Sequence, residues 1–386
     1  MKAIINGKIV TEERIIEGKV LLFHNKIVDI IDEKDLEAYR IKNNKKEMEV
    51  INANGKYVGP GLIDLHIHGS GGADTMDGSL EALNKMSSAI CRRGVTSFLP
   101  TTMTMEVGLI YKALDTIKEA MSLEMKGAKV LGAHMEGPFI SAKYKGAQSA
   151  THIKKPAYEI VKDYLDVIKI ITLAPEEDEG YNFIKKVKKE SQIVLSIGHS
   201  NATYEEANEA IKNGITHATH TFNAMTPLNH RKPGVVGAIF NSDISCELIA
   251  DTVHVHPELF KLLAKIKGIE KVVLITDCIR AGGLGKGISE LGGQKVVVDD
   301  NSARLIDGTL AGSVLGLNLA VKNMLDNTDL KINEVINMAS LNSAKVIGID
   351  DKKGSIKEGK DADIIIFDED LNVDTTIVEG KVVFKR

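Results

Sequence analysis

From Gly59 onward the sequence alternates short apolar runs with amphipathic stretches of helical periodicity. Each apolar run has the length of a buried strand, so the rhythm indicates repeated βα units. Eight such strands predict an α/β fold of the (β/α)8, TIM-like barrel type. A doubly wound sheet has the same rhythm, because periodicity does not show closure. The candidate strands are Leu62–His66, Ser97–Leu99, Val130–Met135, Ile168–Leu173, Ile193–Ile197, His217–Thr219, Ser245–Ile249 and Val272–Thr276.

The amphipathic stretches between these runs predict the helices of the barrel. They are Leu80–Arg93, Val107–Met125, Ala157–Ile168, Tyr204–Asn213, Pro257–Lys267 and Val314–Asp326.

The two ends of the chain have a different pattern, with short strand-like runs separated by turn signals such as Asn-Gly. In the simplest layout residues 1–58 and 355–386 pair into one small β-sandwich domain, and residues 59–354 form the barrel. The expected terminal strands are Ala3–Ile5, Lys8–Val10, Lys19–Phe23, Lys26–Ile30, Ala362–Phe367 and the hairpin Thr375–Phe384 around Glu379-Gly380.

The composition excludes several classes of protein. With 49 basic and 53 acidic residues the chain has a formal charge of −4. Such a charge does not attract the negative phosphates of nucleic acid or of an anionic membrane. The lysine-rich stretches Lys42–Lys46 and Lys185–Lys189 lack stacking aromatics and are predicted to be solvated surface. No apolar run approaches the roughly 20 residues that span a bilayer, and the start lacks a signal-peptide core. Three widely spaced cysteines favour a reducing compartment, so we expect a cytoplasmic protein.

Histidine is the most informative residue type, because ten of the eleven lie between residues 66 and 256. His66 and His68 end the first apolar run, and on a strand residues two apart face the same side, close enough to share one cation. The alternative is a strand end with two chance histidines.

Further histidines and carboxylates follow later strands. Glu136 ends the run before Gly137-Pro138, while His199, His220 and Asp277 follow three others. Catalytic groups of barrels gather at the carboxyl ends of the strands. Together these residues predict a metal site formed by His66, His68, Glu136, His199 and His220.

Imidazole and carboxylate ligands without thiolate suit zinc or iron. A cation of this kind lowers the pKa of bound water to near 7. Asp277 is then the natural general acid/base, which deprotonates the water and protonates an amine leaving group. A further metal ligand or a strand-end cap are the other readings of Asp277.

The motifs PGLIDLHIHG, HMEGPFIS, TLAPE, IGHSNA, THTFNAM and LAGS resemble those of the N-acetylglucosamine-6-phosphate deacetylase family of the amidohydrolase superfamily. The similarity extends over nearly the whole chain. It implies a barrel with a small β domain built from both termini, a homodimer, and hydrolysis of N-acetyl-D-glucosamine 6-phosphate to D-glucosamine 6-phosphate and acetate.

By position, the resemblance assigns Glu136, His199 and His220 to the principal metal and Asp277 to acid/base catalysis. His66 and His68 match an additional ligand pair that only members with two metals use, so the resemblance implies one or two ions per subunit. It also implies contacts with the amino-sugar phosphate. Asn223 and Ala224 match a phosphate-binding segment, and Arg231 matches an arginine that serves the partner subunit's site near the dimer interface; without the resemblance Arg231 would be read as an exposed loop charge. The remaining expected contacts are Ala147 and Gln148 near the acetyl group, His254 near the sugar phosphate, and the loop Leu310, Ala311 and Gly312 over the sugar.

Two positions need comment. Gln148 stands where many relatives carry histidine, and its amide donates a hydrogen bond but cannot become cationic; His152 is a nearby substitute whose offset does not match. The glycine-rich run Gly282–Gly287 has no following helix and is interpreted as a mobile loop over the pocket.

Two alternative functions remain. One is an amidohydrolase that opens a cyclic amide, in which a modified lysine bridges two metals, whereas this chain has Glu136 at the corresponding strand end. The other is a metal-containing sugar-phosphate sensor without turnover, which has no need of Asp277.

Overall fold

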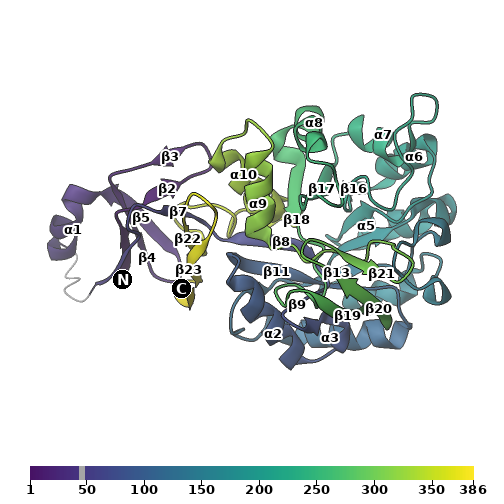
Figure 1. Cartoon of the computed structure of the whole chain (residues 1–386), viewed down its shortest axis with the longest axis horizontal. Helices are drawn as coiled ribbons and strands as arrows, with labels where there is room; N and C mark the ends of the chain where they lie inside the picture. The colour runs from purple at the N-terminus through teal and green to yellow at the C-terminus, as the bar shows by residue number, and fades with distance from the viewer. Residues whose placement is uncertain (43–47) are drawn as a thin grey trace.

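The computed structural model describes residues 1–42 and 48–386; most of the lysine-rich stretch Lys42–Lys46 lies outside the described residues. Eight parallel strands follow one another in chain order around a barrel, with helices on the outside (Figure 1). This arrangement confirms the predicted (β/α)8 fold over the doubly wound alternative. The strands are β8 (Leu62–Ile67), β11 (Val95–Thr102), β13 (Ala133–Glu136), β14 (Ile168–Leu173), β15 (Val194–Ile197), β16 (Ile215–Ala218), β17 (Ser245–Ile249) and β18 (Val272–Ile275).

The barrel closes between its first and last strands. Ile67 of β8 pairs in parallel with Cys278, just after β18. The backbone N–H of Asp277 donates to the carbonyl of His66 at 2.8 Å, and that of His68 donates to the carbonyl of Cys278 at 2.9 Å. The closure therefore joins the predicted ligand His66 to the predicted catalytic residue Asp277 through the backbone, and His68 to the residue after it.

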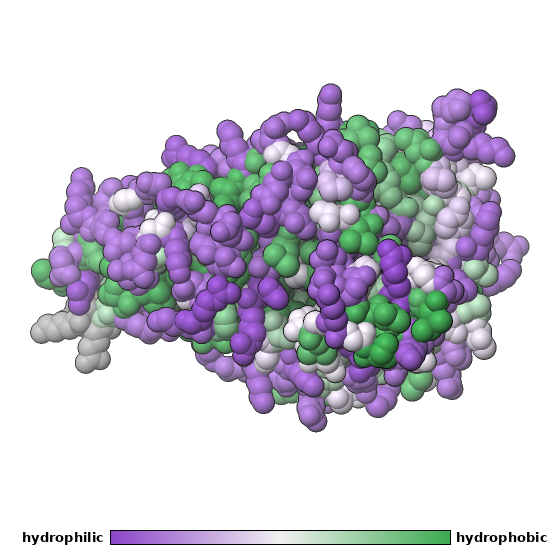
Figure 2. Space-filling view, viewed as in Figure 1, coloured by the Kyte–Doolittle hydropathy of each residue, from purple (hydrophilic) through white to green (hydrophobic). Residues whose placement is uncertain are grey.

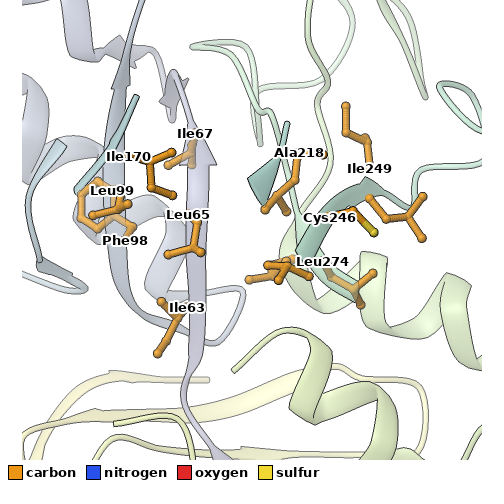
Figure 3. Close-up of a cluster of buried hydrophobic side chains, with 14 of the residues drawn as sticks. Ile63, Leu65, Ile67, Phe98, Leu99, Ile170, Ala218, Cys246, Ile249 and Leu274 are labelled. Carbon is orange, nitrogen blue, oxygen red and sulfur yellow. The ribbon is translucent and has the colours of Figure 1, made fainter. Parts of the chain in front are cut away.

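Side chains alternate along β8 as the pleat requires. Ile63, Leu65 and Ile67 lie along one side of the strand, near Phe98 and Leu99 of β11 (Figure 3). The alternate positions, Asp64 and His66, are also fully buried and face the barrel interior. One strand thus supplies both the apolar layer under the helices and the polar interior.

The barrel helices cover the outer faces of these strands. The predicted helix Ala157–Ile168 is wrong: only Tyr158–Val161 is α-helical, followed by a 3-10 turn at Lys162–Tyr164. Ile168 instead begins β14 and pairs with Ala133, which forces the preceding residues out of the helix. The helices are α2 (Leu80–Cys91), α3 (Val107–Met121), α4 (Tyr158–Val161), α5 (Asn182–Glu190), α6 (Tyr204–Asn213), α7 (Gly234–Phe240), α8 (Glu258–Lys267), α9 (Leu317–Asp326), α10 (Ile332–Met338) and α11 (Leu341–Val346).

Both ends of the chain build two facing sheets beside the barrel (Figure 1). A shared core that includes Ile4 and Phe23 from one sheet and Ile364 and Ile377 from the other makes this a β-sandwich. One sheet has the order β5-β4-β1-β6 and the other β24-β23-β22-β7-β2-β3. Their bounds are β1 (Lys2–Ile5), β2 (Lys8–Val10), β3 (Ile15–Ile16), β4 (Lys19–Phe23), β5 (Ile27–Asp32), β6 (Glu49–Asn52), β7 (Tyr57–Pro60), β22 (Ile364–Phe367), β23 (Val373–Val378) and β24 (Lys381–Lys385), with α1 (Leu36–Lys42) after β5.

A three-stranded antiparallel sheet, β19 (Gly287–Leu291), β20 (Gln294–Val298) and β21 (Ala303–Leu305), follows the glycine-rich run. Its inner residues, such as Leu291 and Val296, pack against Met103 and Ala147 beside the barrel mouth. On the outside Ile288 and Ile306 are exposed. Figure 2 shows apolar side chains gathered over the region of β19, β20 and β21. The element near the pocket is therefore this sheet, and the predicted loop only leads into it. The remaining short strands are β9 (Gly69–Ser70), β10 (Ala73–Asp74) and β12 (Lys129–Val130).

A buried ion pair fixes the junction between the barrel and the terminal sheets. The Nζ of Lys353 lies 2.6 Å from Oδ2 of Asp363 and 3.1 Å from Oδ2 of Asp361. Asp363 also accepts a hydrogen bond from the backbone N–H of Glu379 at 2.8 Å. Both Lys353 and Asp363 are buried, so neither charge has water to replace its partner.

We expect Lys353→Met to destabilise the protein by about 3–5 kcal/mol, because it leaves the Asp363 charge buried without a partner. Urea unfolding followed by circular dichroism measures the loss. Lys357→Met, at an exposed position, is the control and is expected to change stability by less than about 0.5 kcal/mol. Equal stability of the two variants would contradict the role given to Lys353.

Candidate metal centre and active site

The residues predicted as metal ligands, together with Asp277, come together at the carboxyl-terminal rim of the barrel. Each lies at the end of its strand or within a few residues after it, where parallel strands direct their last side chains to a common centre. They are His66 in β8 and His68 after it, Glu136 ending β13, His199 after β15, His220 after β16 and Asp277 after β18.

The Glu136 carboxylate stands in the middle of this cluster. Its Oε1 lies 3.3 Å from Nε2 of His66, 3.2 Å from Nε2 of His199 and 3.1 Å from Nε2 of His220. Its Oε2 lies 3.3 Å from Nε2 of His68. One carboxylate therefore connects two groups of histidines.

Asp277 follows β18, which lies next to β8 where the barrel closes, and its side chain faces the same centre. Its Oδ1 lies 3.3 Å from Nε2 of His68 and 3.5 Å from Nε2 of His66. The loop opposite approaches it closely: a Cβ added to Gly312, where φ is +61°, would lie 2.8 Å from the backbone oxygen of Asp277. The same Cβ would lie 2.6 Å from Cγ2 of Ile279, so a larger residue at position 312 would force one of these neighbours to move.

The Nδ1 atom of each of the four histidines has a hydrogen-bond partner outside the centre, and this leaves Nε2 directed at the centre. For three of them the partner of Nδ1 is a backbone carbonyl, so Nδ1 carries the proton. These partners are Thr101 for His68 at 3.2 Å, Tyr144 for His199 at 2.8 Å and Asn223 for His220 at 3.2 Å. For His66 the partner is the carboxylate of Glu247, at 3.0 Å.

Three of these residues have left-handed backbone conformations, with φ of 49° at His199, 30° at His220 and 50° at Asp277. Such conformations are uncommon outside glycine and cost on the order of 1–3 kcal/mol each. The strain turns the chain sharply at the strand end and aims the side chain into the centre.

The cluster holds opposite charges that compensate one another. Burial favours neutral Glu136, but His199 and His66 outweigh it and hold the pKa of Glu136 well below its usual value. Burial opposes charge on His66, yet Glu136, Glu247 and Asp277 raise its pKa to about 9. Burial likewise opposes charge on His68, and Asp277 and Glu136 raise its pKa well above its usual value. A divalent cation can take the place of such imidazole protons.

The donor set fits a divalent cation. Nε2 of His66 is buried and has no hydrogen-bond partner, so it is available to bind a metal. In each of two triads, His66/His68/Glu136 and Glu136/His199/His220, the ligand atoms lie within 4.8 Å of one another. Nitrogen and oxygen donors without sulfur suit zinc or iron.

A pocket of about 210 Å³ opens beside this cluster. Its lining includes Glu136, His199, His220, Asp277 and most of the residues predicted to contact substrate. These are Ala147, Gln148, Asn223, Ala224, His254, Leu310 and Gly312.

Gln148 contacts the predicted metal ligand Glu136 directly. Its Nε2 donates to Oε2 of Glu136 at 2.6 Å, and its Oε1 accepts from the backbone N–H of Thr104 at 2.6 Å. Both ends of the side-chain amide are thus engaged, and Gln148 orients Glu136 in this structure.

Arg231 is exposed and does not line the pocket of its own chain, as expected of a residue that serves a partner subunit; its Nη1 donates to Nε2 of His230 at 2.8 Å. Two other predicted contacts are arranged differently from the expectation. Ala311 is fully buried behind the pocket wall, where its N–H donates to the carbonyl of Ala303. The backbone N–H of Asn223 donates to the carbonyl of His220 at 2.9 Å, so it is already used within its own loop.

Sequence reasoning missed several residues around the centre. Glu247 is a charged residue inside an apolar strand, a pattern that signals a buried partner. Asp251 accepts from Nδ1 of His254 at 2.6 Å and orients that ring. Leu291 reaches the pocket from β19, and the signal for its hairpin was Gly292-Gly293 between two alternating runs.

The comparisons with known proteins agree with this geometry. The amidohydrolase family model matches residues 57–383, so the chain belongs to the amidohydrolase family. The chain is 43% identical over 385 residues to an N-acetylglucosamine-6-phosphate deacetylase of Bacillus subtilis, with 97% of this chain and 95% of the relative covered. It is 36% identical to an N-acetylgalactosamine-6-phosphate deacetylase of Escherichia coli O157:H7, covering 83% and 86% of the two chains.

A solved structure is also similar. The crystal structure of N-acetylglucosamine-6-phosphate deacetylase from Pasteurella multocida superposes with a TM-score of 0.93 at 33% identity, covering 100% of both chains. These matches confirm the resemblance drawn from the motifs.

Proposed function

We propose that the protein is a metal-dependent hydrolase that removes acetate from N-acetyl-D-glucosamine 6-phosphate and leaves D-glucosamine 6-phosphate. The observation that carries this proposal is the convergence of four histidine Nε2 atoms and Glu136 beside Asp277 at the mouth of a pocket. The names of the relatives support the choice of substrate.

In the proposed reaction some residues bind the metal and another transfers the proton. His199, His220 and Glu136 would hold one cation, and His66 and His68 would hold a second one. When bound, the cation supplies Lewis acidity, which acidifies water and polarises a carbonyl. Asp277 takes the proton of the attacking water at its carboxylate and delivers it to the sugar nitrogen, because an amine anion is too basic to leave unaided.

The rest of the pocket orients the sugar phosphate. Asn223, Ala224 and His254 line the pocket and form the proposed phosphate end. His254 is suited to this role because Asp251 fixes its Nδ1 and leaves Nε2 available. Leu310 and Gly312 approach from the loop that passes Asp277.

We propose a homodimer in which Arg231 contributes to the partner subunit's site. Arg231 is exposed, and among the described residues no carboxylate lies within ion-pair distance, 4.0 Å, of its guanidinium. A guanidinium is suited to a phosphate because it binds two oxygens at once.

The cyclic-amide alternative is less well supported by the pocket. Among the described residues that line it there is no lysine to take the place of a bridging modified lysine, and Glu136 occupies that position. The sensor alternative leaves the placement of Asp277 beside His66 and His68 without a purpose.

The compartment and the metal are also proposals. All three cysteines are free and buried, which suits a reducing compartment such as the cytoplasm. Zinc or iron is proposed from the nitrogen and oxygen donors. Within residues 1–42 and 48–386 no helix has the length and apolar character needed to cross a membrane.

One experiment tests the proposed function. Purified protein is analysed for metal and assayed for acetate release from N-acetylglucosamine 6-phosphate, N-acetylgalactosamine 6-phosphate, and both unphosphorylated sugars. We expect bound zinc or iron and rapid release from the glucosamine phosphate, with slower release from the unphosphorylated sugars because the phosphate provides orientation. Turnover of a dihydropyrimidine or hydantoin alone would refute the proposal, and preference for the galacto isomer would reassign the substrate.

A further inference from the structure

A buried carboxylate that the proposed reaction does not use lies behind the metal centre. Glu247 is in the middle of β17, is fully buried, and is not among the residues that line the pocket. Its strand neighbours Cys246 and Leu248 are apolar and also fully buried. A buried carboxylate is costly unless its oxygens are satisfied, so the partners of Glu247 define its role.

The oxygens of Glu247 connect to two metal-ligand positions. Oε2 lies 3.0 Å from Nδ1 of His66 and accepts a hydrogen bond from the backbone N–H of His220, also at 3.0 Å. Oε1 lies 3.3 Å from Nε2 of His217, whose Nδ1 faces the hydroxyl of Ser245 at 2.7 Å. A single oxygen thus ties the strand that carries His66 to the turn that carries His220.

His66 differs from the other ligand histidines in this partner. The Nδ1 atoms of His68, His199 and His220 face neutral backbone carbonyls, whereas that of His66 faces a carboxylate. An ionised carboxylate only accepts, so Nδ1 of His66 must carry a proton, which leaves Nε2 as the atom for a metal. That Nε2 is the buried atom without a hydrogen-bond partner.

We infer that Glu247 is a positioning residue that controls how tightly a cation is held on the His66/His68 side of the centre, an inference that rests on the proposed metal centre. It fixes the ring orientation and tautomer of His66 and increases its strength as a ligand. The Glu136/His199/His220 side depends on the Glu247 carboxylate only through the backbone N–H of His220, because the N–H of Thr221 bonds to the backbone carbonyl of Glu247, which a side-chain substitution leaves in place. Loss of Glu247 therefore weakens one of the two positions selectively.

Metal titration tests this inference without relying on activity. Metal-free protein is titrated with Zn²⁺ against a chromophoric chelator, for the wild type and for Glu247→Gln. We expect two equivalents in the wild type. In E247Q we expect the second equivalent to bind about 10- to 100-fold more weakly, as for other outer hydrogen-bond partners of metal ligands, while the first keeps its affinity.

Two control variants separate this role from general structural effects. Asp178→Asn removes another buried carboxylate, which accepts from the N–H groups of Phe183 and Ile184 away from the centre, and should keep both equivalents. His217→Gln removes the other partner of Glu247 and should also keep both. If E247Q does not fold, Glu247→Asp, which is shorter by one methylene, makes the same test.

The outcomes distinguish this inference from the proposed function. Unchanged affinity for both equivalents in E247Q or E247D, or an equal loss in H217Q, overturns the positioning role. A wild type that binds a single equivalent also overturns it, while acetate release by that protein leaves the deacetylase proposal intact.

Discussion

Asp277→Asn is expected to lower the rate of acetate release by at least about 100-fold and up to about 10,000-fold, the range for removal of a general acid/base. The amide has the shape of the carboxylate but cannot take the proton from water or return it to the sugar nitrogen. Steady-state acetate release measures the loss, and metal analysis of the same sample shows whether the centre is still loaded.

The variant should fold normally, because asparagine tolerates the left-handed conformation that Asp277 adopts at φ of 50°. Binding of N-acetylglucosamine 6-phosphate, measured by calorimetry, should be retained. As a matched control, Asp307→Asn changes an exposed carboxylate and should leave turnover unchanged. Wild-type-like turnover in D277N would reject the proton-transfer role and favour a metal-ligand or structural role for this residue.

Glu136→Gln is expected to abolish tight metal binding and, with it, acetate release. Its carboxylate lies within 3.3 Å of four histidine Nε2 atoms, so its charge serves both triads. The metal affinity should fall by more than the roughly 100-fold that loss of an outer hydrogen-bond partner costs. Chelator competition measures the affinity, and the acetate assay measures the activity.

Glu179→Gln is the matched control, since Glu179 is exposed and lies away from the pocket. It should retain metal and turnover. A Glu136→Gln protein that holds its full metal complement would show that the histidines alone form the centre, contrary to the arrangement described above.

Local pattern predicted the barrel and the convergence of the candidate metal ligands, because both depend on where the strands end. Each of the eight expected strands is present, and in a closed parallel barrel the residues that end them must meet at one rim. His66, Glu136 and Asp277 could therefore be grouped from sequence although more than 60 residues separate neighbours along the chain. The terminal β-sandwich was likewise visible from turn signals and alternation.

Other features depend on contacts that local pattern does not contain. Residues 157–168 have helical periodicity, but pairing of Ile168 with Ala133 overrides it. The role of Glu247 follows from ring positions on β8 and β16, which only the closed barrel brings together. Gln148 was expected to face the acetyl group, but its partner Glu136 becomes evident only when the loop is folded over the rim.

The left-handed turns at His199, His220 and Asp277 have an evolutionary consequence. Together they destabilise the folded state by several kcal/mol, since each costs on the order of 1–3 kcal/mol. A variant with glycine at these three positions would relieve part of this backbone strain, but it would lose the side chains on which hydrolysis depends. Thermostability and turnover should therefore pull in opposite directions at the rim of this barrel, so attempts to make the enzyme more robust are better directed to its terminal sheets and outer helices.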